Sequence, residues 1–490
     1  MKRQNLIINH QKKRIPKKFL MLKSYAEVKN AIASGVSVLE IVENYLRTIE
    51  KNKHLNAFLE VFEESAKNQA RIVDDKIKTG KSGRLAGMVI GIKDNLCYKN
   101  HKVSAASKIL EGFESLFTAT AIQRLLDEDA IVIGRLNCDE FAMGSSNENS
   151  AFGPVKNNLN NHLVPGGSSG GSAVAVSANL CTAALGSDTG GSIRQPASFT
   201  GTYGLKPTYG RISRYGLIAY ASSFDQIGPF TNTLEDAALL LEIMAGSDEY
   251  DSTSSTQPVE NYASFSKVQP LRIAVISETL NSPGIDPEIV TCIQQVIENL
   301  EKEGHDVQEV SFPFMEYMVP TYYVLSTAEA SSNLSRFDGV HYGHRSTSAI
   351  GVEDTYKKSR SEGFGPEVQR RIMAGTFVLS HGYYDAYYTK GQKVRRVLKD
   401  KTDEILKDFD AILMPTTPCT AFELNAVKEP VKMYLQDIFT VHANLTGHPA
   451  ISLPLGMHSN GLPYGIQLMS RPFQEKNLFD IAAFIETITK

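Results

Sequence analysis

The chain lacks the sequence features that are typical of membrane, secreted and metal-binding proteins. No apolar run in its 490 residues reaches the roughly 18 residues that indicate a membrane span. Its five cysteines are an odd number and lack the short paired spacing of a zinc site or a disulfide framework. No cluster of His, Asp and Glu has the spacing of metal ligands. We therefore expect a cytoplasmic protein without membrane contact, metal or redox cofactor.

A strong excess of either charge is also missing. Lys and Arg number 51 against 54 Asp and Glu, which gives a net charge of -3. A nucleic-acid-binding protein usually carries a basic field, so any RNA should be held mainly by a partner. No charge run or linker rich in Pro and Ser divides the chain after Leu22, and we expect one large domain over residues 22–490.

The first 21 residues differ in composition from the rest of the chain. They contain no acidic residue and seven basic ones: Lys2, Arg3, Lys12, Lys13, Arg14, Lys17 and Lys18. We interpret residues 1–21 as a basic N-terminal extension that is disordered or lies upstream of a true start at Met21. A transit peptide is disfavoured because the stretch contains no serine.

Helix and strand signals alternate along the chain. Helices are predicted to begin after Ser37, near Thr120 and at Asp286. Apolar runs predict strands at 88–92, 131–133, 271–276 and 307–312. This order implies an α/β fold with a mixed, largely parallel sheet that helices cover on both faces.

Three residues stand where an apolar segment breaks into a turn. Lys93 closes one such run, Ser168 lies in a Gly-Gly-Ser-Ser-Gly-Gly tract, and Ser192 ends the turn Asp-Thr-Gly-Gly-Ser. A serine becomes nucleophilic when a base takes its proton, and a neutral lysine can do so directly or through another hydroxyl. Keeping a lysine neutral at pH 7 costs roughly 4.6 kcal/mol, so the site must be desolvated. The N–H groups of Thr189, Gly190, Gly191 and Ser192 can form an oxyanion hole.

The glycine-serine tract also fits two other patterns. It resembles a flexible linker, but it runs directly into the apolar residues 173–176 and is better interpreted as a loop that opens a helix. It also satisfies the G-x-S-x-G elbow, with Ser168 as nucleophile and Asp437 paired with His442 or His448. That alternative gives neither Lys93 nor the Ser192 turn a role.

At these residues the chain resembles the amidase signature family, serine hydrolases in which a Ser-Ser-Lys triad cleaves amides. The resemblance implies that Ser192 is the nucleophile and that Lys93 is the final base. It implies that Ser168 bridges the two and follows a cis peptide bond. Cys138 departs from the family pattern, which has methionine there, and we expect this change to affect only packing.

Residues 139–153, 329–339 and 362–371 are similar to the amidase subunits of tRNA-dependent amidotransferases within this family. This branch implies a carbon–nitrogen ligase with glutamine as amido donor. The chain would hydrolyse glutamine through an acyl ester and pass ammonia to a B subunit. That partner would bind the tRNA and use ATP and Mg²⁺ to amidate glutamate on the glutamine tRNA, aspartate on the asparagine tRNA, or both. A small C subunit would complete the assembly, and this chain itself would hold no cofactor.

The same resemblance implies which residues bind glutamine. Arg371 is assigned to the α-carboxylate, with Arg370 as the alternative, because a guanidinium binds a carboxylate bidentately. Asp437 is assigned to the α-ammonium group, and Tyr323 or Tyr322 to the pocket mouth. Two other functions stay open at this point: a free-standing amidase for a small amide, and a structural subunit without catalysis.

Overall fold

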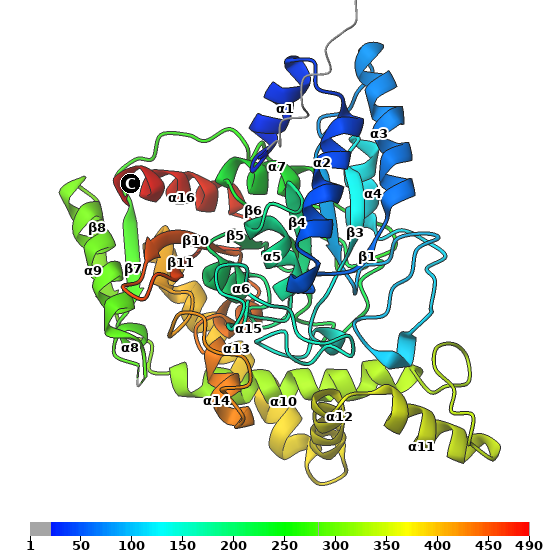
Figure 1. The fold of residues 1–490 in the computed structure, drawn as a ribbon. Coiled ribbons are helices and arrows are strands. Elements are labelled where there is room, and N and C mark those ends of the chain that lie inside the picture. Colours follow the sequence, from blue (N-terminus) through cyan, green and yellow to red (C-terminus); the bar gives the residue numbers. More distant parts are fainter. Residues whose placement is uncertain (1–20, 283, 490) are drawn as a thin grey trace, which may run out of the picture.

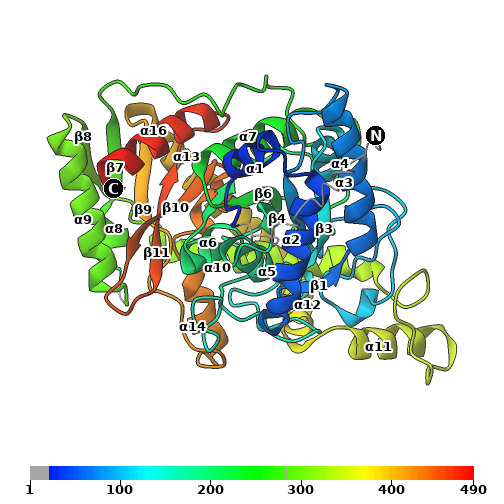
Figure 2. The same ribbon diagram turned by 45° about the horizontal axis from the view of Figure 1, so that its top comes forward.

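The computed structural model describes residues 21–282 and 284–489, and the predicted basic extension, apart from Met21, falls outside them. Eleven strands form the sheet: β1 (Phe58–Val61), β2 (Val89–Lys93), β3 (Ile131–Leu136), β4 (Ala183–Asp188), β5 (Tyr203–Lys206), β6 (Gln226–Thr231), β7 (Arg272–Ile276), β8 (Asp306–Val310), β9 (Ala411–Pro415), β10 (Ala450–Met457) and β11 (Pro463–Met469). They lie in the order β1-β3-β2-β4-β6-β5-β10-β11-β9-β7-β8 (Figure 2).

Helices flank this sheet on both sides (Figure 1). The α-helices of the described residues are α1 (Tyr25–Ala33), α2 (Val38–Lys51), α3 (Glu63–Lys78), α4 (Thr120–Asp127), α5 (Gly170–Ser177), α6 (Arg194–Thr200), α7 (Leu234–Met244), α8 (Ser277–Leu280), α9 (Pro287–Lys302), α10 (Met315–Asn333), α11 (Gly351–Gly363), α12 (Pro366–Leu379), α13 (Lys390–Asp408), α14 (Pro430–Tyr434), α15 (Val441–Thr446) and α16 (Glu475–Thr489). Helices α7 and α16 lie on one side of the sheet, and α10 and α13 lie on the other.

The strand pairing confirms a mixed α/β sheet but corrects the expectation that it is largely parallel. Parallel pairs occur only in the groups β3-β2-β4 and β9-β7-β8. The other six of the ten pairs are antiparallel. The central strands include a hairpin, β10–β11, and short connections of this kind permit only antiparallel pairing. Strands such as β6 also contain glycine and proline, so no continuous apolar run in the sequence predicted them.

Local signals placed several elements correctly. The capping box of Ser37 and Glu40 precedes α2, and Asp286 is the N-cap of α9 with Pro287 in its first turn. The glycine-serine tract opens α5, as predicted. Lys93 is the last residue of β2. These boundaries agree because a cap, a proline or a glycine acts on the backbone within a few residues.

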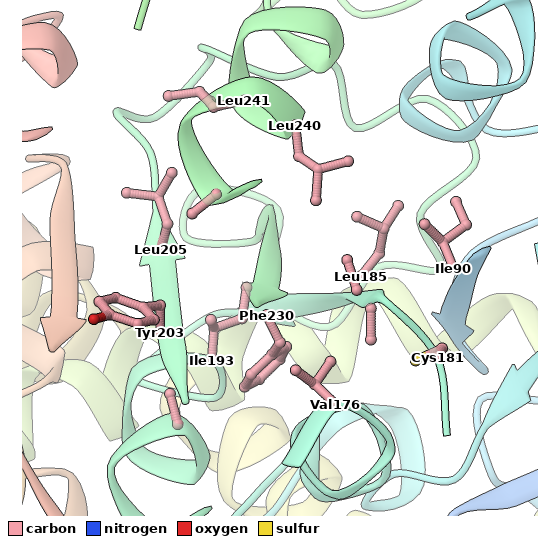
Figure 3. Close-up of a cluster of buried hydrophobic side chains, with 14 of the residues drawn as sticks. Ile90, Val176, Cys181, Leu185, Ile193, Tyr203, Leu205, Phe230, Leu240 and Leu241 are labelled. Atoms are coloured by element: carbon pink, nitrogen blue, oxygen red, sulfur yellow. The ribbon is translucent and has the colours of Figure 1, made fainter. Parts of the chain in front are cut away.

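A buried apolar cluster holds the central strands in place. Figure 3 shows Ile90 on β2, Leu185 on β4 and Phe230 on β6 between α7 and α5. Val176 of α5 approaches the strands from one side, and Leu240 of α7 lies on the other. Close packing of this kind transmits strain and resists displacement. It therefore fixes the ends of β2 and β4, where the site residues of these strands lie.

Candidate active site

Of the three residues that the sequence singled out, Lys93 and Ser168 are in direct contact, and Ser192 lies on an adjacent turn whose carbonyl accepts from the Ser169 N–H. Strands β2 and β4 are parallel neighbours, so their carboxyl ends lie side by side. Lys93 ends β2, and Ser192 lies in the turn between β4 and α6. Ser168 lies two residues before α5. Lys93 and Ser168 are fully buried, whereas 8% of Ser192 is exposed.

Lys93 is surrounded by hydroxyl groups. Its Nζ lies 2.7 Å from Ser168 Oγ, 2.8 Å from Ser169 Oγ and 2.9 Å from Ser187 Oγ. Burial lowers the pKa of Lys93 to about 8. Sequence reasoning missed Ser169 and Ser187, although both stand close to residues it selected, because adjacency does not tell which hydroxyl points toward the amine.

The peptide bond between Gly167 and Ser168 is cis, which confirms the implication of the resemblance. The Gly167 N–H donates to Gln195 Oε1 at 2.9 Å, and the Ser168 carbonyl accepts from Asp139 N–H at 3.0 Å. A Cβ atom at Gly167 would lie 2.2 Å from Asp139 Oδ2. The tract therefore requires glycine here because the buried Asp139 carboxylate lies against its backbone.

The turn that carries Ser192 is held by a buried ion pair. The Asp188 carboxylate accepts from Arg194 Nε at 3.0 Å and from Nη2 at 2.9 Å. Burial raises the pKa of Asp188, but the Arg194 charge outweighs it and brings the pKa to about 2. Asp188 also accepts the Gly191 N–H at 2.8 Å. Among the described residues, the N–H groups of Gly190 and Ser192 have no hydrogen-bond partner.

The predicted glutamine-binding residues come from a different part of the fold. Arg371 lies on α12 and is buried, whereas Arg370 is about half exposed and bonds to Glu367. Arg371 Nε donates to Glu367 Oε1 at 2.8 Å, and Nη1 donates to the Tyr220 hydroxyl at 2.8 Å. The structure therefore favours Arg371 as the buried cation of the pair.

Asp437 is buried in the 3₁₀ turn η6 (Leu435–Asp437). Its Oδ2 accepts from Ser145 Oγ at 2.6 Å, and burial raises its pKa to about 7. Thr440 connects this segment to the Ser192 turn, since its hydroxyl donates to the Gly190 carbonyl at 2.7 Å. Ser145 and Thr440 carried no sequence signal that separated them from other hydroxyl residues.

The two candidate tyrosines lie against different parts of the site. A Cβ atom at Gly190 would lie 2.5 Å from Tyr322 Cζ, so Tyr322 packs on the turn before Ser192. Tyr323 stacks on Tyr434, with 4.0 Å between ring centroids, and its ring centroid lies 5.2 Å from the Arg371 guanidinium. Tyr323 is thus the one of the two beside the buried cation.

A cavity of about 310 Å³ opens beside Arg371. Its lining includes Gly144, Ser146, Glu367, Arg371 and Tyr434. A volume of this size accommodates a small polar molecule. The lining contains charged side chains, among them Glu367 and Arg371. It also contains Gly144 and Ser146, the neighbours of Ser145, whose hydroxyl donates to Asp437.

The elbow alternative finds no support in the geometry. His442 Nε2 lies 2.7 Å from Thr402 Oγ1, and His448 Nε2 lies 3.0 Å from Asp403 Oδ1. Burial lowers the pKa of His442 to about 3. Neither of these contacts involves Ser168, whose hydroxyl lies against Lys93. A Ser-His-Asp relay needs the serine and histidine within hydrogen-bond reach.

In residues 21–282 and 284–489, no group of three or more His, Cys, Asp or Glu is arranged to hold a metal ion. Within the same residues, no helix is both long and apolar enough to cross a membrane.

The chain is similar to known proteins over nearly its whole length. The family model described as Amidase matches residues 40–479. The chain is 49% identical over 469 residues to the A subunit of the glutamyl-tRNA(Gln) amidotransferase of Chlorobium phaeobacteroides, covering 94% of this chain and 98% of the relative. The crystal structure of the protein with this same name from Thermotoga maritima superposes with a TM-score of 0.76 at 41% identity, covering 92% and 94% of the two chains. Native peptide amidase from Stenotrophomonas maltophilia superposes with a TM-score of 0.79 at 27% identity, covering 97% and 98%.

Proposed function

The chain belongs to the amidase family, and on this premise we propose that it is the glutamine-hydrolysing subunit of a glutamyl-tRNA(Gln) amidotransferase. The observation that carries the catalytic part is the buried contact between Lys93 and Ser168 beside the Ser192 turn. The identity of 49% over nearly the full length supports the amidotransferase branch, against 27% for the peptide amidase. The enzyme class is therefore a carbon–nitrogen ligase with glutamine as amido donor.

The relay begins with a neutral Lys93. A lysine whose pKa is about 8 is partly neutral near pH 7 to 8 and can accept a proton there. Ser169 donates its own proton to the Ser187 carbonyl at 3.1 Å, so its hydroxyl accepts from Lys93. Ser168, whose Oγ lies closest to the Lys93 amine, gives its proton to that amine. It takes the proton of Ser192 as Ser192 Oγ attacks the side-chain amide carbon of glutamine.

The developing oxyanion would be stabilised by backbone N–H groups of the turn. Gly190 and Ser192 offer N–H groups without a partner among the described residues, and Thr189 precedes them. Gly191 belongs to the predicted set, but its N–H donates to Asp188 and orients the turn instead. Fixed donors of this kind stabilise charge where it develops without reorganising during the reaction.

The collapse of the tetrahedral intermediate completes the first half of the reaction. The proton returns through Ser168 to the leaving nitrogen, the carbon–nitrogen bond breaks, and ammonia leaves. The acyl group stays on Ser192 as an ester. Water then attacks this ester, with the same relay accepting its proton, and releases glutamate.

Glutamine is a zwitterion, and the site offers one buried group for each charge. Arg371 would hold the α-carboxylate, and Asp437 would hold the α-ammonium group. Tyr323, which lies beside Arg371, would line the mouth of the pocket. The pairing of two buried charges with a ligand of opposite charges gives specificity, because a ligand that lacks one of them leaves a buried ion without a partner.

The ammonia would pass to partner subunits. A B subunit would bind the misacylated tRNA and use ATP and Mg²⁺ to amidate it, and a small C subunit would join the assembly. The chain's net charge of -3 supports a division of labour in which the partner holds most of the tRNA.

The test is ammonia release from glutamine by the chain alone and by the chain co-expressed with its candidate partner subunits, with misacylated tRNA and ATP added. We expect release to rise sharply with the full assembly. Vigorous hydrolysis of simple amides by the lone chain, unaffected by partners or tRNA, would instead identify a free-standing amidase. An assembly that amidates tRNA only from added ammonia would identify a structural subunit.

A further inference from the structure

Glu367 lies in the first turn of α12, and its carboxylate accepts hydrogen bonds from three side chains. Oε1 accepts from Arg371 Nε at 2.8 Å and from the Tyr434 hydroxyl at 3.0 Å, and Arg370 Nη1 bonds to Oε2. Only 11% of the Glu367 side chain is exposed. Both oxygens therefore accept from protein donors, so Glu367 is placed to orient the side chains around it.

The main neighbour is Arg371, whose orientation is fixed from several sides. A guanidinium has five N–H donors, and the Arg371 bonds to Glu367 and Tyr220 use one on Nε and one on Nη1. Its centre lies 5.6, 5.2 and 5.5 Å from the ring centroids of Tyr220, Tyr323 and Tyr434. The remaining Nη hydrogens, which have no other partner among the described residues, form the planar fork that suits a carboxylate.

Glu367 also joins two elements that line the cavity. It belongs to α12, whereas Tyr434 is the last residue of α14. The Tyr434 ring stacks on Tyr323, and its hydroxyl contacts Glu367. Glu367, Arg371 and Tyr434 all line the cavity of about 310 Å³. One carboxylate thus sets the position of the cation and of the aromatic ring beside it.

We propose that Glu367 is a positioning residue for glutamine: it holds the Arg371 guanidinium and the Tyr434 ring so that the α-carboxylate of the substrate meets a preformed fork. This inference rests on the proposed function and deepens it. Among the described residues, the bonds of Glu367 do not include Lys93, Ser168 or Ser192, so it acts on binding and not on the chemical steps. Its removal should therefore raise KM and leave kcat nearly unchanged.

A role of Glu367 limited to its charge would have the opposite effect on KM. If Glu367 only neutralised positive charge, its loss would leave Arg370 and Arg371 uncompensated and would attract a carboxylate more strongly. KM would then fall. If Glu367 positions Arg371, the loss of a charge-assisted hydrogen bond frees the guanidinium, and KM should rise about ten-fold.

The experiment measures glutamine-dependent ammonia release by the assembled enzyme with Glu367→Gln, which keeps the shape of the side chain. We expect KM for glutamine about ten-fold higher and kcat within about two-fold. Tyr434→Phe keeps the ring and removes its hydroxyl contact with Glu367, and it should raise KM by about three-fold. The matched control is Glu353→Gln, another first-turn glutamate with a partner four residues on, Lys357, but on an exposed surface. It should leave both constants unchanged.

The outcomes separate this inference from the proposed function. A KM that stays constant or falls in Glu367→Gln overturns the positioning role, as does a loss confined to kcat. If Glu367→Gln does not assemble, Tyr434→Phe decides alone, and an unchanged KM there overturns the proposal. A wild-type assembly that does not hydrolyse glutamine overturns the proposed function itself, and this inference with it.

Discussion

Two regions of the site each bury a cation, and they differ in whether a carboxylate compensates its charge. Lys93 lies among three serine hydroxyls and has no ion pair with any described residue. Arg371 lies among aromatic rings and pairs with Glu367. Burial penalises the charged form of a group unless an opposite charge compensates it. The first environment lowers the pKa of Lys93 to about 8, which suits the proposed base, and the second preserves the positive charge that the proposed binding of a carboxylate needs.

The groups that surround the two cations also differ in the chemistry that they allow. Hydroxyl groups can pass a proton, so the region around Lys93 can carry the relay. The region around Arg371 contains the Glu367 carboxylate, to which Arg371 donates, and a cavity of about 310 Å³. If Lys93 serves the proposed relay and Arg371 the proposed binding of glutamine, substitutions in the two regions should affect different kinetic constants.

The largest expected effect comes from Ser192→Ala. The substitution removes the proposed nucleophile, and we expect kcat for glutamine hydrolysis to fall at least about 10⁴-fold. Binding of glutamine should persist, because Arg371 and Asp437 are unchanged. Ammonia release and calorimetric binding of glutamine measure the two properties. Hydrolysis above about one per cent of the wild-type rate would show that another group attacks the amide.

Lys93→Met should lower kcat about 10³-fold, because it removes the base but keeps the volume of the side chain. Lys206→Met is the matched control. Lys206 is also fully buried, and burial lowers its pKa to about 7, but its Nζ donates to the Pro207 carbonyl and not to a serine. We expect its kcat within about ten-fold of the wild type. Equal losses of kcat in both variants would mean that the loss follows from replacing any buried lysine. That result would contradict the proposed relay.

The pH dependence of kcat/KM should report the titration of both Lys93 and Asp437. Lys93 must be neutral to accept a proton, so the rate of glutamine hydrolysis should fall as the pH falls through about 8. Asp437 must be ionised to hold an ammonium group, so binding is lost as pH falls through about 7. The logarithm of kcat/KM should therefore rise with a slope of about two below pH 7 and of about one between 7 and 8. A flat profile from about pH 6 to 8 would contradict both assignments.

Asp437→Asn should have the smallest of these effects and should act on binding. We expect KM for glutamine to rise about 30-fold with kcat nearly constant, because a charge-assisted hydrogen bond is lost. The slope of the pH profile below 7 should fall from about two to about one. The monoamide of glutaric acid, which lacks the ammonium group, provides the control: its KM should not rise in the variant, because the variant has no buried carboxylate that this substrate leaves without a partner. A variant that discriminates between the two substrates as the wild type does would remove Asp437 from the site.

Part of the fold was accessible from the sequence because its signals are local. Ser37 caps α2, Asp286 caps α9, and an apolar run ends at Lys93, and each acts within a turn or a strand. The pairing of the central strands was not accessible. Their order joins β4 to β6 and β5 to β10, which lie far apart along the chain, and such contacts leave no periodic signal in either strand.

By itself, the sequence determined where the chain turns and which residue types stand at those turns, because glycine, serine and lysine in the motifs act through their own backbone and side chain. Only the tertiary structure decided which groups face one another. Arg370 and Arg371 are neighbours on one helix, about 100° apart around its axis, so the packing of α12 against Tyr220 and Tyr323 selects one of them. The same holds for Ser169 and Ser187, which contact Lys93 because β2, α5 and β4 pack together.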